Sequence, residues 1–85
     1  MAITEEQVMR EIQTILTEQL EASQTYFLTD RLAGCAELDS VGLLTLAVGL
    51  EDRFRVKLAE QDAPGLETFA DLVSLVIRRH RESAS

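Results

Sequence analysis

Apolar residues recur every three or four positions along three stretches of the chain, which is the spacing of one buried face of an α-helix. The first stretch begins at Thr4-Glu5-Glu6-Gln7, a capping-box sequence in which a hydroxyl and a side-chain amide satisfy free N–H groups at a helix start. Ile3 is placed to pack on Val8 as a hydrophobic staple. We therefore predict a first helix over about residues 5–21. Its apolar face holds Val8, Ile12, Ile15, Leu16 and Leu20.

Two further helices have similar start signals. Asp39 is a favoured N-cap, so a second helix is predicted from Ser40 to about Arg55. Thr68 with Asp71 forms a second capping-box-like start, so the last helix is predicted to begin there. The inward positions are Leu43, Leu46, Ala47, Leu50 and Phe54 on the second helix, and Phe69, Leu72, Val73, Val76 and Ile77 on the last.

The segments between these helices lack a sustained period. Residues 22–38 are predicted to form a long ordered loop, with room for one short helical turn. Its apolar anchors are Tyr26, Phe27, Leu28 and Leu32. Pro64 and Gly65 limit residues 60–66 to a short helix. The fold predicted is all-α: a small four-helix bundle of three main helices and one short helix, forming a single domain over residues 1–85.

Composition narrows the class of protein. A chain of 85 residues is long enough for one small core but not for a large active-site cleft. The net charge of −7 opposes binding to nucleic acid and favours basic protein partners. No basic leader precedes an apolar stretch, and the apolar run near residues 41–50 is too short to cross a bilayer, so we expect a cytoplasmic monomer. Cys35 is the only cysteine, which excludes an internal disulfide, and it has no CxxC partner. We interpret it as a bystander.

The candidate chemistry lies at Asp39-Ser40. Ser40 falls in the first turn of the predicted second helix, where free N–H groups and the helix dipole favour an attached phosphate. A plain helix start is the commoner meaning of this dipeptide taken alone. No Gly-x-Ser-x-Gly motif surrounds the serine, and His80 is distant in sequence, within a basic tail that suits a helix C-terminus. We therefore expect Ser40 to be modified rather than catalytic, and the chain not to be an enzyme.

A longer pattern gives the dipeptide its context. Leu38-Asp39-Ser40-Val41 is followed by Leu46, Leu50-Glu51-Asp52-Arg53-Phe54, Val56-Lys57-Leu58 and Thr68-Phe69-Ala70-Asp71-Leu72-Val73. Over residues 38–77 this pattern resembles the acyl carrier protein family. The resemblance implies that Ser40 carries 4′-phosphopantetheine, with Asp39 as part of the motif, and that a thioester on the arm holds an acyl group. It also implies a phosphopantetheinyl transferase and acyl-activating ligases or synthases as partners.

The chain departs from that family pattern beside the serine. Position 37 is Glu where fatty-acid-type carriers usually have glycine, and Val41 stands where leucine commonly follows the serine. The exposed side of their second helix is strongly acidic, whereas here charge first appears at Glu51 and Asp52. The positions expected on this side before the charge are Gly42, Leu44, Thr45 and Val48.

Val41, Leu44 and Val48 share a helical face distinct from the inward one, which predicts an apolar docking surface. Leu44 could instead turn partly inward and join the core. The expected partner-binding residues are Val41, Leu44, Thr45, Val48, Glu51 and Asp52.

Several functions stay open at this point. The departures favour a carrier of a specialised pathway, including polyketide biosynthesis, or an aminoacyl or peptidyl carrier, over one for primary fatty acid synthesis. An unmodified helical adaptor could use the same apolar face without any group on Ser40. A small hydrolase using Ser40 is the weakest alternative, since the sequence supplies neither an oriented base nor an oxyanion hole. The cargo and its enzymes are not specified by the sequence.

Overall fold

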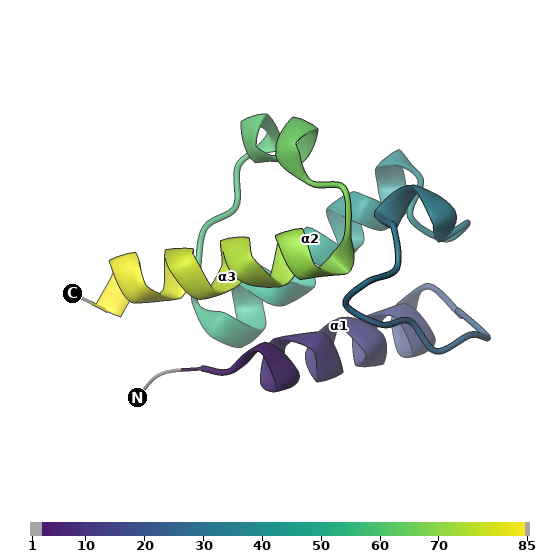
Figure 1. The fold of residues 1–85 in the computed structure, drawn as a ribbon, viewed down its shortest axis with the longest axis horizontal. Coiled ribbons are helices and arrows are strands. Elements are labelled where there is room, and N and C mark those ends of the chain that lie inside the picture. The colour runs from purple at the N-terminus through teal and green to yellow at the C-terminus, as the bar shows by residue number, and fades with distance from the viewer. Residues whose placement is uncertain (1–2, 85) are drawn as a thin grey trace.

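Three α-helices surround one apolar core, and a long loop and a short connection complete the chain (Figure 1). The computed structural model describes residues 3–84, apart from the side chains of residues 60, 61, 63, 83 and 84. Within this range the helices are α1 (Glu5–Gln19), α2 (Ser40–Phe54) and α3 (Phe69–Ala84), with short 3₁₀ helices η1 (Leu32–Gly34) and η2 (Glu60–Gly65). No strand occurs there beyond an isolated bridge between Arg31 and Thr68. The predicted all-α fold is confirmed.

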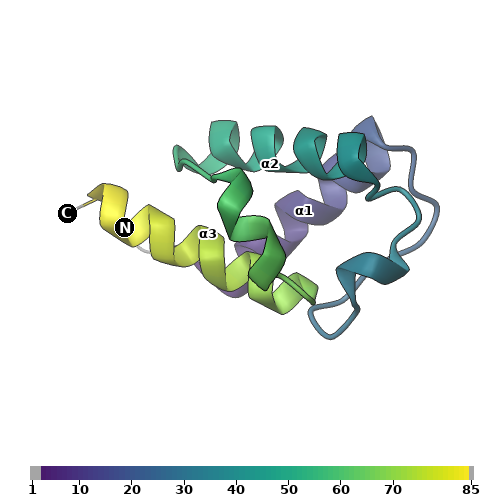
Figure 2. The ribbon, with the colours of Figure 1, turned by 90° about the horizontal axis from the view of Figure 1, so that it is seen from above.

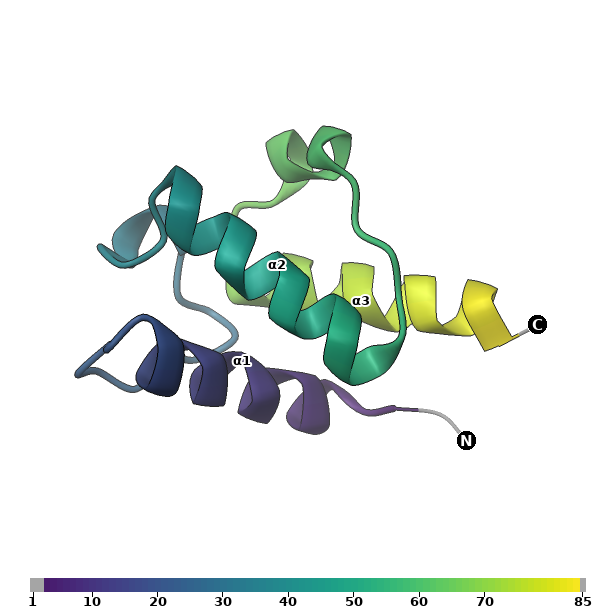
Figure 3. The same ribbon diagram turned by 180° about the vertical axis from the view of Figure 1, so that it is seen from behind.

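The short helix η2 and the helix α1 lie on opposite sides of α2 and α3 (Figure 1). Seen from behind, α2 runs diagonally in front of α3, and α1 lies below both (Figure 3). From above, η2 lies between α2 and α3, on the side away from α1 (Figure 2). The loop joining α1 to α2 closes one end of the molecule, at the start of α2 (Figures 1 and 2).

The predicted helix starts are confirmed by their caps. The Gln7 N–H donates to Thr4 Oγ1 at 3.1 Å, and the Thr4 N–H donates to Gln7 Oε1 at 2.9 Å. At α3 the Asp71 N–H donates to Thr68 Oγ1, and the Thr68 N–H donates to Asp71 Oδ2. The backbone N–H groups of Glu67 and Thr68 stabilise the Asp71 carboxylate and lower its pKa. The helix ends differ slightly from prediction, because Glu21 and Arg55 adopt left-handed backbone angles just after α1 and α2.

The core is built from the predicted inner faces of α1 and α3. The buried face of α2 is rotated about the helix axis relative to the face that the sequence predicted. Leu46 and Leu50 are fully buried, as predicted, and Gly42 and Gly49 are buried beside them. Leu43, Ala47 and Phe54 are only half-buried, so their assignment to the core was correct only in part. Gly42 had been expected on the exposed side, and that expectation was wrong. The buried residues besides the glycines are Val8, Ile12, Ile15, Leu16, Ala22, Leu32, Cys35, Leu46, Leu50, Val56, Phe69, Leu72, Val73, Leu75 and Val76.

The loop between α1 and α2 is ordered through hydrogen bonds to α1 and to the segment that leads into α3. Gln13 of α1 accepts the Tyr26 N–H at 2.7 Å and donates to the Gln24 carbonyl at 3.1 Å. On the other side the Leu32 N–H donates to the Glu67 carbonyl at 2.9 Å. Tyr26 and Leu28 pack against the core and Leu32 lies in it, but Phe27 is 63% exposed, so its predicted anchoring role was wrong.

Two glycines of α2 allow close packing on that helix. A Cβ at Gly49 would lie 2.7 Å from Ile15 Cδ1, so the missing side chain lets α1 approach α2. A Cβ at Gly42 would overlap the main-chain carbonyl oxygen of Glu37. Glycine weakens a helix interior, and here that cost is offset by contacts that a side chain would prevent.

The rotated face of α2 gives a direct test. Leu46→Ala should lower the free energy of unfolding by roughly 2–5 kcal/mol, because a fully buried leucine leaves a cavity. Val48→Ala should cost less than about 1 kcal/mol, because about half of Val48 is exposed and it lies outside the core. Urea unfolding of both variants measures the difference. A larger loss for Val48→Ala would show that the buried face has been misassigned.

The contact at Gly42 gives a second test. Gly42→Ala should destabilise the protein by about 1–3 kcal/mol, because the carbonyl it meets belongs to the backbone and cannot rotate away. Gly34→Ala is the matched control: Gly34 lacks a positive φ and has open space at its Cβ, so alanine there should stabilise by about 0.4–1 kcal/mol. Thermal unfolding monitored by circular dichroism compares the two. Equal effects of both changes would contradict the close approach at Gly42.

Candidate functional site

Ser40 is the first residue of α2 and its side chain is exposed. Asp39 precedes it as the N-cap, and its Oδ1 accepts the Gly42 N–H at 2.8 Å. The Asp39 carbonyl accepts the Leu43 N–H at 2.8 Å, which begins the helical hydrogen bonding. The predicted start of α2 is therefore confirmed. The hydroxyl of Ser40 stands at the positive end of a helix dipole, where a negatively charged group is favoured.

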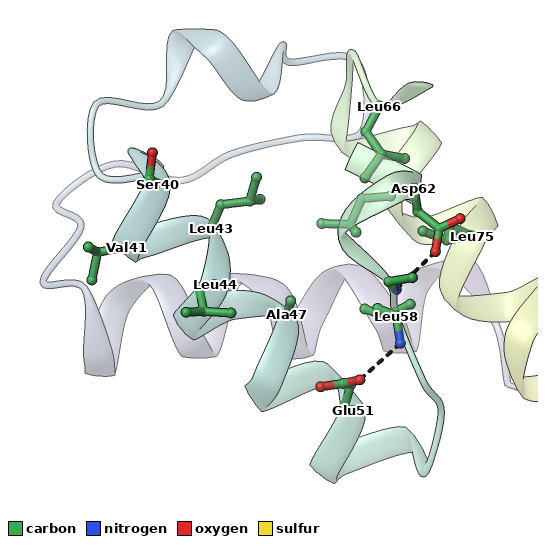
Figure 4. Close-up of a pocket in the computed structure, with 12 residues that line it drawn as sticks. Ser40, Val41, Leu43, Leu44, Ala47, Glu51, Leu58, Asp62, Leu66 and Leu75 are labelled. Carbon is green, nitrogen blue, oxygen red and sulfur yellow. Dashed lines mark hydrogen bonds between the residues drawn. The ribbon is translucent and has the colours of Figure 1, made fainter. Parts of the chain in front are cut away.

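Beside Ser40 lies an apolar cavity of about 570 Å³ between α2, η2 and the first half of α3 (Figure 4). This volume falls in the range of about 300–1,000 Å³ that is usual for small-ligand pockets. Ser40 is at one end of it, while Leu43 points from α2 across the cavity toward Leu66 (Figure 4). The described residues that line it are Ser40, Val41, Leu43, Leu44, Ala47, Glu51, Leu58, Ala59, Asp62, Leu66, Leu72 and Leu75.

Two carboxylates among the described residues of the cavity, those of Glu51 and Asp62, hold its outer wall in place. Glu51 Oε2 accepts the Leu58 N–H at 2.9 Å, and Asp62 Oδ2 accepts the Ala59 N–H at 3.0 Å (Figure 4). Arg79 of α3 donates to Asp62 Oδ1 at 2.8 Å and to the Lys57 carbonyl at 3.1 Å. These bonds fasten the segment between α2 and η2 to both helices. The remaining surface of the cavity is mainly aliphatic and suits an alkyl group.

The exposed side of α2 is the second surface that adjoins Ser40. Val41, Leu44 and Val48 are 71%, 60% and 48% exposed, which places all three on the outside as expected. Leu44 also lines the cavity, so it contributes to both surfaces without entering the core. Thr45 is half-buried and its hydroxyl donates to the Val41 carbonyl at 3.0 Å. Binding of a partner by these residues stays a prediction.

The two acidic residues predicted to bind partners have different environments. Glu51 is half-buried and its carboxylate is engaged with the Leu58 N–H, whereas Asp52 is exposed. Asp52 is thus the more accessible charge at this end of α2. The sequence-based prediction missed Leu58, Leu66 and Leu75 as cavity residues. Their apolar character is visible in the sequence, but their convergence depends on where η2 and α3 pack.

The parts of a serine hydrolase do not converge on Ser40 in the described residues. The C-terminal half of α3, which carries His80, lies at the opposite end of the molecule from the start of α2 (Figures 1 and 2). Across residues 3–84, no group of three or more His, Cys, Asp or Glu side chains is placed to hold a metal ion. The same part of the chain contains no helix long and apolar enough to cross a membrane.

Cys35 is more integrated into the fold than a bystander in a loop. It is 2% exposed and forms part of the apolar core. Its thiol lies 3.6 Å from Glu37 Oε1, the same oxygen that accepts the Tyr26 hydroxyl at 3.2 Å. Hydrogen bonding with Cys35, burial and the nearby Glu37 carboxylate raise the pKa of Tyr26, which favours the protonated hydroxyl as a donor.

Comparison with known proteins extends the resemblance to nearly the whole chain. An acyl carrier protein of Rhodococcus erythropolis is 28% identical over 85 residues, covering 99% of this chain and 93% of that protein. A meromycolate extension acyl carrier protein of Mycobacterium leprae is 26% identical over 84 residues, covering 98% of this chain and 73% of the relative. An acyl carrier protein of Exiguobacterium sibiricum is 28% identical over 75 residues, covering 87% of this chain and 95% of that protein.

No protein-family model matches the chain. The similarity to named acyl carrier proteins nevertheless spans nearly the whole chain, and the all-helical fold is consistent with it. Residues 38–77 carried the resemblance in the sequence, and the relatives extend it to α1. This chain is thus similar to acyl carrier proteins at 26–28% identity over most or all of its length.

Proposed function

We propose that this protein is a discrete, non-catalytic carrier that holds acyl groups as thioesters on 4′-phosphopantetheine attached to Ser40. The observation that carries this proposal is the position of Ser40: exposed, first in α2, and at one end of an apolar cavity of about 570 Å³. The whole chain, residues 1–85, would act as one carrier domain, and residues 1, 2 and 85 lie outside the described part.

The surroundings of Ser40 fit the attached group. Its hydroxyl is open to solvent, and the helix start offsets the negative charge of a phosphodiester next to Asp39. In the transfer, Ser40 Oγ attacks the phosphorus of coenzyme A that bears the pantetheine. The pyrophosphate bond breaks, adenosine bisphosphate leaves, and the hydroxyl proton passes to a base on the transferase. When bound, the arm supplies a thiol for thioester formation.

An acyl cargo fits the cavity better than an aminoacyl cargo. The described lining is mainly leucine and alanine, and Glu51 and Asp62 in it accept hydrogen bonds from the backbone. Each methylene buried there would contribute about 0.8 kcal/mol, whereas an ammonium group would lose hydration against a mainly aliphatic lining. The relatives are named as acyl carriers, which supports the same choice. We propose synthases or acyl-activating ligases of fatty acid, polyketide or other specialised biosynthesis as partners, in the cytoplasm.

The exposed face of α2 favours a second candidate, an unmodified adaptor. Val41, Leu44 and Val48 would bind a partner in either case, so the face alone does not distinguish the two functions. The state of Ser40 does, because an adaptor does not require its modification.

Modification of Ser40 is therefore the deciding test. Incubation with coenzyme A and a promiscuous phosphopantetheinyl transferase should add one phosphopantetheine to the wild type and none to Ser40→Ala, as measured by intact-protein mass spectrometry. Ser74→Ala is the matched control, since Ser74 is an exposed serine on α3 and should leave the uptake intact. Both alanine variants should keep the helical circular dichroism. Absence of uptake by the wild type would favour the adaptor.

The docking surface can be tested with the loaded protein. Val48→Asp should impair cargo transfer with the cognate enzyme at every salt concentration, because a carboxylate desolvated at an apolar interface costs several kcal/mol. Asp52→Lys should mainly change the association rate, and its effect should shrink as salt rises, because exposed charges are screened over about 8–10 Å. Transfer kinetics at low and high salt measure both. Normal transfer by Val48→Asp, with a large salt-dependent loss for Asp52→Lys, would show recognition by charge instead.

A further inference from the structure

Glu37 links the loop before α2 to the core through its side chain. One oxygen, Oε1, accepts the Tyr26 hydroxyl at 3.2 Å and lies 3.6 Å from the Cys35 thiol. Cys35 is buried and Tyr26 is half-buried, so both partners are themselves fixed. We call this set of three side chains, Tyr26, Cys35 and Glu37, the loop latch.

Tyr26 connects the loop latch to two of the three α-helices. Its backbone N–H donates to Gln13 Oε1 of α1 at 2.7 Å. Its ring packs on Phe69 at the start of α3, with the ring centroids 5.4 Å apart. The hydroxyl that reaches Glu37 therefore comes from a residue whose backbone is held by α1 and whose ring packs on α3. The bond to this hydroxyl fixes Glu37, and with it the end of the loop just before α2.

The main chain of Glu37 also meets the first turn of α2. Its carbonyl oxygen packs so closely on Gly42 that no Cβ fits between them. Gly42 is the residue whose N–H is capped by Asp39. Ser40 therefore lies between two fixed points of the chain. The loop latch holds Glu37 before it, and Gly42 after it packs on the Glu37 carbonyl.

We propose that Glu37 is a positioning residue, which through Tyr26 and Cys35 holds the Asp39–Ser40 turn in the conformation that the phosphopantetheinyl transferase binds. The inference rests on the proposed function of Ser40. A transferase must fit the reacting hydroxyl into its own active site, so a turn that is already ordered avoids the cost of ordering it on binding. Release of the latch lowers the fraction of the binding-competent turn and raises KM by the inverse of that fraction, while kcat stays the same.

The variants separate positioning from general stability. Glu37→Ala removes the acceptor and should raise KM for the carrier by about threefold to tenfold with kcat unchanged. Glu37→Gln keeps an oxygen that can accept both bonds and should restore KM to near the wild-type value. Tyr26→Phe removes only the hydroxyl and keeps the ring on Phe69, so it should shift KM in the same direction. Glu18→Ala is the matched control, since it removes an equal charge from an exposed residue that makes none of the latch contacts.

The measurement combines transferase kinetics with backbone amide hydrogen exchange of the unmodified protein. In Glu37→Ala, exchange at the hydrogen-bonded amides of Leu38, Gly42 and Leu43 should become faster than in the wild type, Glu37→Gln and Glu18→Ala. The double variant Tyr26→Phe/Glu37→Ala should have the same KM as Glu37→Ala. Loss of the Glu37 carboxylate already removes the acceptor of the Tyr26 hydroxyl, so the second change breaks nothing further. A lower melting temperature with unchanged KM and unchanged exchange would overturn the proposal and leave Glu37 a stability residue.

The exchange experiment needs no transferase. Failure of the wild type to take up the arm would count against the proposed function, while exchange would still decide whether the latch orders the turn.

Discussion

The arrangement of the site depends on how closely α2 packs against its neighbours. Gly49 admits Ile15 of α1 and Gly42 admits the Glu37 carbonyl, so the buried face of α2 is defined by two glycines as much as by Leu46 and Leu50. A larger residue at either position would push α2 outward. Because the residues of a helix rotate together, this buried face also determines which side chains line the cavity and which face the solvent.

Much of the fold could be predicted because its signals are local. Helix starts depend on residues within one turn of each other, and the caps at Thr4, Asp39 and Thr68 are all present. The cavity could not be predicted in the same way. It needs Leu58 and Leu66, from a connection without helical period, to converge with α2 and α3. The role of Gly42 was also hidden, since its contact is with a main-chain atom of the preceding loop.

The acidic residues show why composition alone says little about recognition. The chain carries a net charge of −7, yet several carboxylates near the site are engaged inside the protein. Glu51 and Asp62 hold the wall of the cavity, and Glu37 holds the loop. Hydrogen bonds of this kind fix structure more than they attract partners, because an engaged carboxylate has fewer lone pairs to offer. The surface next to Ser40 is left largely apolar, with Asp52 as an exposed charge further along α2.

Leu44 joins the two surfaces that a carrier would need. It is 60% exposed on the outer side of α2 and also lines the cavity that begins at Ser40. An alkyl chain in the cavity and a partner on the outer face would therefore both contact this side chain. A partner that moved this side chain would change the apolar lining available to the cargo. If Ser40 bears the proposed arm, recognition and cargo release would be coupled through the packing of one leucine, since two ligands that contact the same group affect each other's binding reciprocally.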